Sequence, residues 1–417
     1  MNWKLNFINS LIVKSQLISE LKWQIIEKLL RSFTTVFISL LITTYFGAEI
    51  FGKYGYALAL TNIFIGLSNL GMPNLIVAQI SKYRINRKKI INIFFKIRIF
   101  TTAIIFLIFV IHCFYNLKLG LLLSLSVGSS FLEIFENYNQ GTLNIIKNCK
   151  SKIVAFSIGL ILKLLSIFYL KDYKLVLLIY SFEFFISYFF IYKFTSLDIR
   201  ELLFSNVDKR LFRNIIKKLV PLSTTSLFTI LSAKLDILII QSRFGYSLLG
   251  QYNIFSQVIL IWSIIPLMFT NYHMPRLAKS YSTSVIEYKK ELVKYGRIYL
   301  LIGIIISAIS LVVFNIQYSL LNYNNKEIYL ASSILCLINI PLSMSLLQSS
   351  IIAINNLQLY GFIKTVLNFI IMLFLALIFS NYFGIVGLPI AINISYITSE
   401  YILPKVLKNN IRFSLIF

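Results

Sequence analysis

The chain has 417 residues, of which 58% are hydrophobic and 13% are charged; soluble domains carry roughly a quarter charged residues, so this composition excludes an ordinary soluble protein. A net charge of +25 would suit nucleic acid, but the basic residues alternate with apolar stretches and do not gather on one polar face, so nucleic acid is not an expected partner. Three widely separated cysteines, Cys113, Cys149 and Cys336, fit neither a zinc motif nor a disulfide framework, and we expect no metal, cofactor or catalytic residue.

The first 22 residues place three lysines among apolar residues, without a continuous apolar core or a cleavage site. We therefore predict a short amphipathic helix in the cytoplasmic interface and not a signal peptide. A membrane-spanning helix needs about 20 apolar residues. The remaining chain holds twelve such stretches, at residues 24–46, 54–80, 97–116, 118–140, 152–170, 174–194, 219–242, 249–272, 296–317, 327–353, 360–381 and 384–405.

The basic residues predict the orientation of these spans. Thirty of the forty Lys and Arg residues fall in every second gap, and the other gaps hold six. Because short loops rich in Lys and Arg stay in the cytoplasm, the rich gaps are predicted to be cytoplasmic, and both termini lie on that side.

Two sequence motifs recur in the second half of the chain. The motif Phe46-Gly47-x4-Gly52-x-Tyr54 returns as Phe244-Gly245-x4-Gly250-x-Tyr252, and Met72-Pro73-x-Leu75 returns as Met274-Pro275-x-Leu277. Each repeat unit corresponds to six spans, an even number, so the two halves have the same orientation in the membrane.

These patterns predict an all-α membrane protein of about twelve transmembrane helices in two parallel six-helix bundles. Residues 1–212 form the N-terminal bundle with its amphipathic helix, and residues 213–417 form the C-terminal bundle. This is the commonest architecture of a secondary carrier, in which access to the substrate alternates between the two sides. The sequence has no Gly-x4-Gly-Lys-Ser/Thr phosphate loop, so we expect transport without ATP hydrolysis. Three prolines within spans are predicted hinges: Pro221, Pro266 and Pro341.

Charged residues inside spans are candidate site residues, because burial in lipid is costly. Arg31 lies one to two turns into the first span, and it either snorkels or faces the interior. Lys163 lies deep in the fifth span, and Lys234 and Asp236 lie at similar depth in the seventh. Lys234 and Asp236 are two residues apart, about 200° on a helix, so they neutralise each other poorly. For these deep charges a transport role competes with a structural pair between helices.

Three acids are candidates for coupling or charge pairing. Glu133 and Glu136 are neighbours on one helix face, where like charges oppose ionisation, as proton or cation exchange requires. An exposed helix end explains the two acids equally well. Glu183 lies in the middle of the sixth span among phenylalanines, where apolar surroundings favour its neutral form.

A family resemblance appears in the same regions. The run Arg31…Phe46-Gly47-x4-Gly52-x-Tyr54-x12-Leu67-x-Asn69-Leu70-Gly71-Met72 resembles the opening of the bacterial polysaccharide exporters of the Wzx type. The second half is similar to that family at Leu219-Val220-Pro221-Leu222, Asp236, Gly250-Gln251-Tyr252, Ile265-Pro266, Met274-Pro275-Arg276-Leu277 and Gly384-x-x-Gly387.

The resemblance implies the fold of the multidrug/oligosaccharidyl-lipid/polysaccharide exporter superfamily, with two bundles around a central cavity. It implies a multi-pass flippase of the bacterial inner membrane. Its cargo would be an undecaprenyl-diphosphate-linked oligosaccharide repeat unit, moved from the cytoplasmic to the periplasmic leaflet for O-antigen (lipopolysaccharide), capsule or exopolysaccharide assembly. Carried onto this chain, Arg31, Lys163 and Lys234 are the expected anion contacts, and Asp236 matches the acidic position of the second half.

The expected partners are this lipid-linked oligosaccharide, membrane lipids, H⁺ or Na⁺ as coupling ion, and a polysaccharide polymerase with its chain-length regulator. The protein is expected to be a monomer.

Two alternative functions stay open. One is a cation-coupled antiporter of a small amphiphile within the same superfamily, which predicts that acids outweigh cations in the cavity. The other is a membrane polymerase or glycosyltransferase, which usually needs a large periplasmic loop that this chain lacks. The sequence does not identify the sugars carried or the coupling ion.

Overall fold

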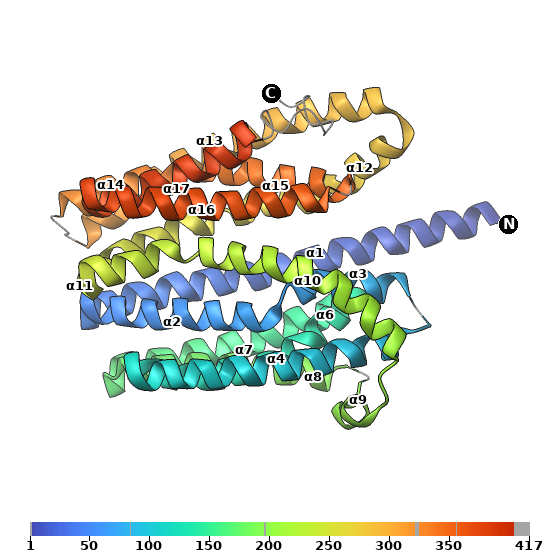
Figure 1. Ribbon diagram of the computed structural model, residues 1–417, viewed down its shortest axis with the longest axis horizontal. Helices are drawn as coiled ribbons and strands as arrows, with labels where there is room; N and C mark the ends of the chain where they lie inside the picture. The colour runs from blue at the N-terminus through green and yellow to red at the C-terminus, as the bar shows by residue number, and fades with distance from the viewer. Residues whose placement is uncertain (1, 84, 196, 322–324, 356, 404–417) are drawn as a thin grey trace. The chain divides into compact units, whose positions relative to one another are not determined.

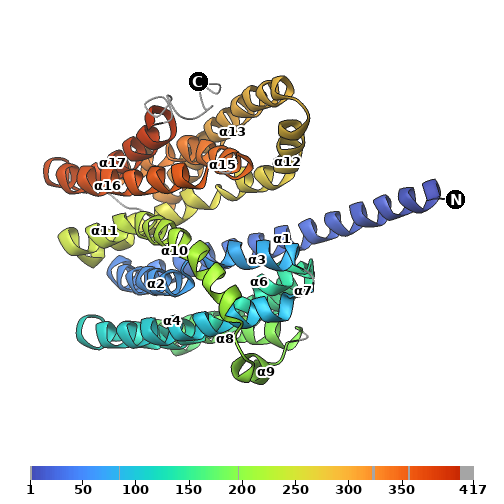
Figure 2. The same cartoon turned by 45° about the vertical axis from the view of Figure 1, so that its right-hand side comes forward.

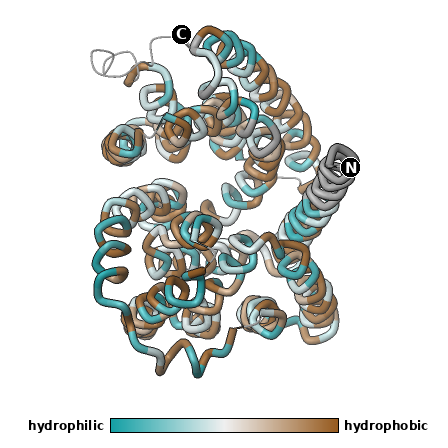
Figure 3. The backbone as a smooth tube through the Cα atoms, turned by 90° about the vertical axis from the view of Figure 1, so that its right-hand side faces the viewer, coloured by the Kyte–Doolittle hydropathy of each residue, from teal (hydrophilic) through white to brown (hydrophobic). Residues whose placement is uncertain are grey.

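The computed structural model describes residues 2–83, 85–195, 197–321, 325–355 and 357–403. Within these ranges every regular element is a helix, as the sequence predicts (Figure 1). Eleven segments are long and apolar enough to cross a membrane, and α1 (Asn2–Phe46) contains the first predicted span in addition. In Figure 3 apolar residues recur along these helices. The chain is therefore a multi-pass membrane protein.

The chain divides into two compact units. Unit 1 comprises residues 1–45 and 57–226, and unit 2 comprises residues 46–56 and 227–417. The sequence predicts a boundary after residue 212, whereas the units separate within α10 (Lys209–Ser232). The start of α2 (Ala48–Asn69) also groups with unit 2, because it packs on a helix of the second repeat.

Unit 1 is built on α1, which runs unbroken from Asn2, so the predicted N-terminal helix is continuous with the first span. The amphipathic face predicted for it falls on side chains outside the described set. Beyond α1, unit 1 contains most of α2 and the first part of α10, together with α3 (Met72–Lys82), α4 (Arg87–Asn116), η1 (Lys118–Leu123), α5 (Ser124–Gly128), η2 (Ser129–Leu132), α6 (Glu133–Gly141), α7 (Ile145–Leu165), η3 (Ser166–Leu170), α8 (Tyr173–Lys193) and α9 (Ile199–Phe204).

An apolar core holds the end of unit 1 at which α4 begins and α8 ends. Phe94 and Phe95 of α4 and Phe135 of α6 are completely buried there, and Ile215 of α10 packs against the same cluster. Burying one such side chain stabilises a fold by about 1.5–3 kcal/mol. The core thus fixes the helices that carry the charged residues described below.

Unit 2 contains the beginning of α2, the end of α10, and the remaining helices. These are α11 (Leu235–Ile261), α12 (Ile264–Thr283), α13 (Val285–Leu320), α14 (Lys326–Cys336), α15 (Asn339–Ile354), α16 (Gln358–Tyr382), η4 (Gly384–Val386), α17 (Gly387–Ile397) and η5 (Thr398–Ile402). The core cluster described in unit 2 is centred on Tyr299, Leu347 and Leu277, each fully buried.

The seventh and eighth spans differ in detail from the predicted ranges. The seventh begins at Lys209, breaks at residues 233–234, and continues into α11. Gly245 interrupts α11 with φ 80° and ψ −177°, so α11 holds the end of one crossing and the start of the next. The predicted spans 219–242 and 249–272 end and begin on either side of Gly245, in agreement with this interruption.

The duplicated glycines of the two repeats meet in unit 2. Gly47 and Gly245 occupy equivalent turns with φ of 85° and 80°, a region that glycine adopts without steric cost. Five residues later, α2 and α11 cross. A Cβ added to Gly52 would lie 1.9 Å from the carbonyl oxygen of Tyr246, and one added to Gly250 would lie 1.8 Å from that of Ala48. The recurring motif therefore encodes a symmetric helix crossing at backbone contact.

Candidate functional site

Arg31 is the most accessible of the predicted site cations. It shares a face of α1 with Ile38 and Ile42, seven and eleven residues later, whose side chains are 3% and 0% exposed. Arg31 itself is exposed, and its guanidinium carbon lies 5.9 Å from the ring centre of Phe156 on α7. It therefore projects toward the other helices of unit 1 while it stays open to water, which favours an interior role over snorkelling at the interface.

The surroundings of Arg31 are aromatic and polar. Tyr180 and Tyr188 of α8 act on its charge electrostatically, as do Glu27 and Glu136. Glu27, four residues earlier, forms no ion pair with it, and Arg31 has no ion-pair partner anywhere in the described parts of the chain. A cation without a fixed counter-ion beside the Phe156 ring can receive a phosphate.

Lys163 and Glu183 form a buried ion pair between α7 and α8. The Lys163 ammonium donates to the Glu183 carboxylate, and the two side chains are 8% and 9% exposed. Gly159, one turn before Lys163, makes room for the acid, because a Cβ there would lie 2.2 Å from Glu183 Oε2. Lys163 is therefore not an uncompensated cation, and the structural alternative weighed from the sequence describes its contacts better.

Glu133 and Glu136 each have a cation of their own. Arg98 Nη2 of α4 lies 2.8 Å from Glu133, and Lys152 Nζ of α7 lies 2.7 Å from Glu136. Tyr188 also donates to Glu133 at 3.3 Å. The repulsion expected between two neighbouring acids is thus offset by two separate pairs. The sequence gives no sign of these partners, because Arg98 and Lys152 border apolar stretches and look like loop residues.

Lys234 lies at the break between α10 and α11 in unit 2. It precedes the first residue of α11 with non-helical dihedral angles, and its side chain is half-buried. The residues that the structure describes provide no ion-pair partner for it. Its ammonium is available to an anionic ligand.

Asp236 is satisfied by neighbours other than Lys234. Its carboxylate accepts a hydrogen bond from the Tyr252 hydroxyl at 3.0 Å and from the backbone amide of Ile237 at 2.8 Å. Lys234 acts on Asp236 electrostatically, without an ion pair between them. The two charges are unpaired with each other, but Lys234 lies in the break before α11 with non-helical dihedral angles, so the helical rotation assumed from the sequence does not explain it.

A second buried pair, which no sequence pattern indicates, joins Lys364 of α16 and Glu400 of η5. Lys364 Nζ lies 2.6 Å from Glu400 Oε2 and 3.0 Å from Gln348 Oε1 on α15. Gln348 in turn donates to the Glu400 carbonyl oxygen. Glu400 is 1% exposed. Lys364 looks like an ordinary loop cation in the sequence, because it stands near the start of its apolar stretch.

The two buried Lys–Glu pairs occupy the same helix pair of each repeat, but at opposite ends. In both repeats the lysine lies on the fifth span and the acid on the sixth. Lys163 lies near the end of α7, whereas Lys364 lies near the start of α16. A π-helical turn, η3 or η5, adjoins each pair, and such turns are frequent at functional sites.

The three predicted hinge prolines lie close to interruptions of spans or within a span. Pro266 and Pro341 fall in the first turns of α12 and α15, just after helix breaks at residues 262–263 and 337–338. Pro221 lies inside α10, and the Thr224 and Thr225 hydroxyls donate to its carbonyl oxygen. These are positions where a helix can bend, and hinge motion at them stays a prediction.

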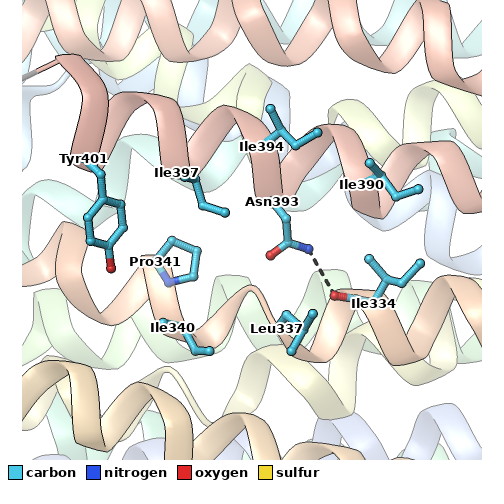
Figure 4. A pocket seen from close by; sticks show the side chains of 9 residues that line it. All are labelled: Ile334, Leu337, Ile340, Pro341, Ile390, Asn393, Ile394, Ile397 and Tyr401. Carbon is cyan, nitrogen blue, oxygen red and sulfur yellow. Dashed lines mark hydrogen bonds between the residues drawn. The ribbon is translucent and has the colours of Figure 1, made fainter. Parts of the chain in front are cut away.

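An apolar groove of about 490 Å³ lies between α14–α15 and α17 within unit 2. Figure 4 shows its nine lining residues, most of them isoleucines. Asn393 is turned to the wall, where its amide donates to the Ile334 carbonyl oxygen at 3.0 Å. This leaves an almost purely hydrocarbon surface. No group of His, Cys, Asp and Glu in the described ranges could hold a metal ion.

The chain matches a family model described as polysaccharide biosynthesis protein over residues 21–281. No curated protein matches it in sequence. Several solved structures share its fold. An inward-facing multidrug resistance MATE family transporter of the MOP superfamily has a TM-score of 0.71 at 14% identity, covering 92% of this chain and 96% of that one.

Two further structures are similar along nearly their whole length. The lipid II flippase MurJ in an inward closed conformation has a TM-score of 0.68 at 15% identity, with 94% of this chain and 88% of that chain covered. A MOP superfamily transporter from Pyrococcus furiosus, described by the reverse polarity of its binding pocket, has a TM-score of 0.66 at 12% identity, with 97% and 96% covered. At these identities the likeness establishes the fold.

Proposed function

This chain belongs to the polysaccharide biosynthesis protein family and has the fold of MOP superfamily transporters; from that premise we propose that it is a flippase for an undecaprenyl-diphosphate-linked oligosaccharide. It moves the repeat unit from the cytoplasmic to the periplasmic leaflet of a bacterial inner membrane by alternating access, for O-antigen, capsule or exopolysaccharide assembly. The step is transport and makes or breaks no covalent bond.

The charge balance of the membrane interior supports this proposal. Glu133, Glu136, Glu183 and Glu400 each have a cationic partner, whereas Arg31 and Lys234, one in each unit, have none among the described residues. A diphosphate cannot cross about 30 Å of hydrocarbon unshielded. Unpaired cations can replace part of its hydration, and they are the feature on which the proposal rests.

The small-amphiphile antiporter reading is weaker for the same reason. That reading predicts acids left free to exchange a proton or bind a cationic substrate. In the described chain Glu133, Glu136, Glu183 and Glu400 are compensated by lysine or arginine, and Asp236 accepts two hydrogen bonds. Glu27, on the first span, is buried and forms no ion pair among the described residues. Arg31 and Lys234, which have no ion-pair partner among the described residues, suit an anionic cargo.

We expect Arg31→Ala and Lys234→Ala each to lower surface polysaccharide about tenfold or more at normal protein abundance. One charge-assisted hydrogen bond to a phosphate is worth roughly 1.5–3 kcal/mol. Arg31→Lys and Lys234→Arg should keep part of the activity, because the charge persists while its geometry changes. The readouts are polysaccharide per cell and membrane-inserted protein per cell.

Lys326→Ala is the matched control, because Lys326 is an exposed lysine at the start of α14. It should export normally. Wild-type polysaccharide from both Arg31→Ala and Lys234→Ala would contradict the proposed anion site. Equal loss in the Lys326 variant would show that the assay reports on general damage.

A further inference from the structure

The segment that follows α8 is fastened to α4 in unit 1. Lys88 Nζ lies 3.2 Å from Glu201 Oε1, Lys96 donates to the Ser205 carbonyl oxygen at 2.6 Å, and the Asn92 amide donates to the Asn206 carbonyl oxygen at 3.4 Å. Leu202 of α9 is 4% exposed and belongs to the core of the unit. The segment is therefore packed against α4 and the core of unit 1, with defined contacts.

Each of the three acids in this segment is bound, either by a backbone amide of the segment or by a lysine of α4. The Asp198 carboxylate accepts the backbone amide of Arg200 at 2.9 Å, and that of Asp208 accepts the amide of Arg210 at 3.0 Å, so both cap helix starts. Glu201 binds Lys88. The carboxylates are thus held by donors, which leaves the positive charge of this surface dominant.

The surrounding surface is strongly basic. Residues 82–83, 85–89, 194–195 and 197–213, which we call the elbow, contain eight Lys and Arg against three acids. Lys89, Arg200, Lys209, Arg210 and Arg213 are exposed and form no ion pair among the described residues. The elbow therefore presents several ammonium and guanidinium groups to its surroundings.

Large apolar side chains project beside these cations. Phe204 is 85% exposed, Ile85 is 98% exposed and Leu203 is 42% exposed. Figures 1 and 2 both draw α9 at the margin of unit 1, beside the ends of α4 and α8. This is the end that the charge pattern predicts to be cytoplasmic. Contact of such side chains with water would be unfavourable, at roughly 25 cal/mol per Å².

We propose that the elbow is an interfacial anchor that binds the phosphate headgroups of anionic phospholipids in the cytoplasmic leaflet, with Phe204 inserted at the border of the acyl chains. The chemistry is that of amphipathic interfacial segments, which combine basic side chains with buried aromatic ones. Anionic lipid attracts each nearby Lys or Arg, and the apolar tip supplies insertion. The proposal needs only that the chain spans a membrane and is independent of its cargo.

An acidic soluble protein would fit the charge but not the position. The exposed apolar residues lie beside the start of α4 and the end of α8, two helices long and apolar enough to cross a membrane. The capping acids, the hydrogen bonds from Lys96 and Asn92, and the buried Leu202 also fix the elbow before any partner binds. A lipid surface therefore explains the basic residues, the exposed aromatic residue and the marginal location together.

The test is the depth of a nitroxide label on Phe204→Cys in the full-length protein. The native cysteines are buried, so the label will react at the new site. The protein is placed in nanodiscs of phosphatidylcholine alone or with phosphatidylglycerol, and collision rates with oxygen and with a water-soluble nickel chelate are compared. Asn206→Cys, exposed on the same segment, is the water-facing control.

We expect the label at position 204 to favour oxygen over nickel in phosphatidylglycerol discs, and to become several-fold more accessible to nickel in phosphatidylcholine alone. Neutralising Arg200, Lys209 and Arg210 to Gln should remove that difference between the two lipids. Equal burial in both lipids would overturn the headgroup site. Water exposure in both would overturn the anchor and leave the surface to a soluble acidic partner.

Discussion

Lys364→Met is expected to lower the stability of the protein by about 3–5 kcal/mol, because it leaves the Glu400 carboxylate buried without its cation. Glu400 is 1% exposed, and Lys364 is its ion-pair partner at 2.6 Å. Unfolding in detergent can be followed with a thiol-reactive dye, since all three native cysteines are buried in the folded protein. The unfolding temperature should fall markedly.

The double variant Lys364→Met/Glu400→Gln should recover most of the lost stability, because replacing both members of a buried pair is often close to neutral. Lys88→Met is the matched control, since the Lys88–Glu201 pair is exposed at 67% and 56%, and exposed pairs contribute about 0–1 kcal/mol. A Lys364→Met variant as stable as Lys88→Met would contradict this account of the pair.

The same design decides the role of Lys163. Lys163→Met should reduce protein abundance, and Lys163→Met/Glu183→Gln should restore it, since the two side chains form one buried pair. If export returns together with abundance, the pair is structural. Restored abundance without export would return Lys163 to the set of cargo contacts, where the sequence placed it.

Gly250→Ala is expected to have a comparably large effect on stability. Its Cβ would stand 1.8 Å from the carbonyl oxygen of Ala48, and no rotamer change can relieve a contact with backbone. Overpacking costs roughly 1–3 kcal/mol where side chains can adjust, so we expect the upper end of this range or more. The unfolding temperature in detergent is again the measurement, and Gly52→Ala should behave alike.

Gly361→Ala provides the matched control for the crossing. Its nearest neighbour would be Ile352 Cγ2 at 3.2 Å, a side-chain atom that can move, and alanine also favours a helix over glycine. Stability close to the wild type is expected there. If Gly250→Ala and Gly361→Ala proved equally stable, the helices would not be held at backbone contact by the duplicated glycines.

Apolar length and repetition predicted the fold because both are local properties of the sequence. The spans, the duplicated turns at Gly47 and Gly245, and the helical fold follow from hydropathy and glycine spacing. Helix breaks were harder to predict, because the interruptions at residues 233–234 and 262–263 do not interrupt the apolar composition.

The sequence predicted which charged residues lie in the spans, but not which of them form pairs. The sequence identified Arg31, Lys234, Lys163 and Glu183 as charges in apolar stretches. It could not show that Lys163 and Glu183 meet, since pairing depends on the rotation and depth of two different helices. Lys364 and Glu400 were missed because they stand near span ends, where charges are common, although the structure buries both.

The most direct test of the proposed function is flipping by the purified protein in liposomes. The probe is a fluorescent undecaprenyl-diphosphate-linked oligosaccharide present in both leaflets, and a membrane-impermeant reductant bleaches the outer leaflet. The account predicts that wild-type protein exposes the inner-leaflet fraction to bleaching, whereas Arg31→Ala/Lys234→Ala leaves it protected, as in protein-free liposomes. Inner-leaflet probe that stays protected with active wild-type protein, while a small cationic amphiphile is transported, would contradict the flippase assignment.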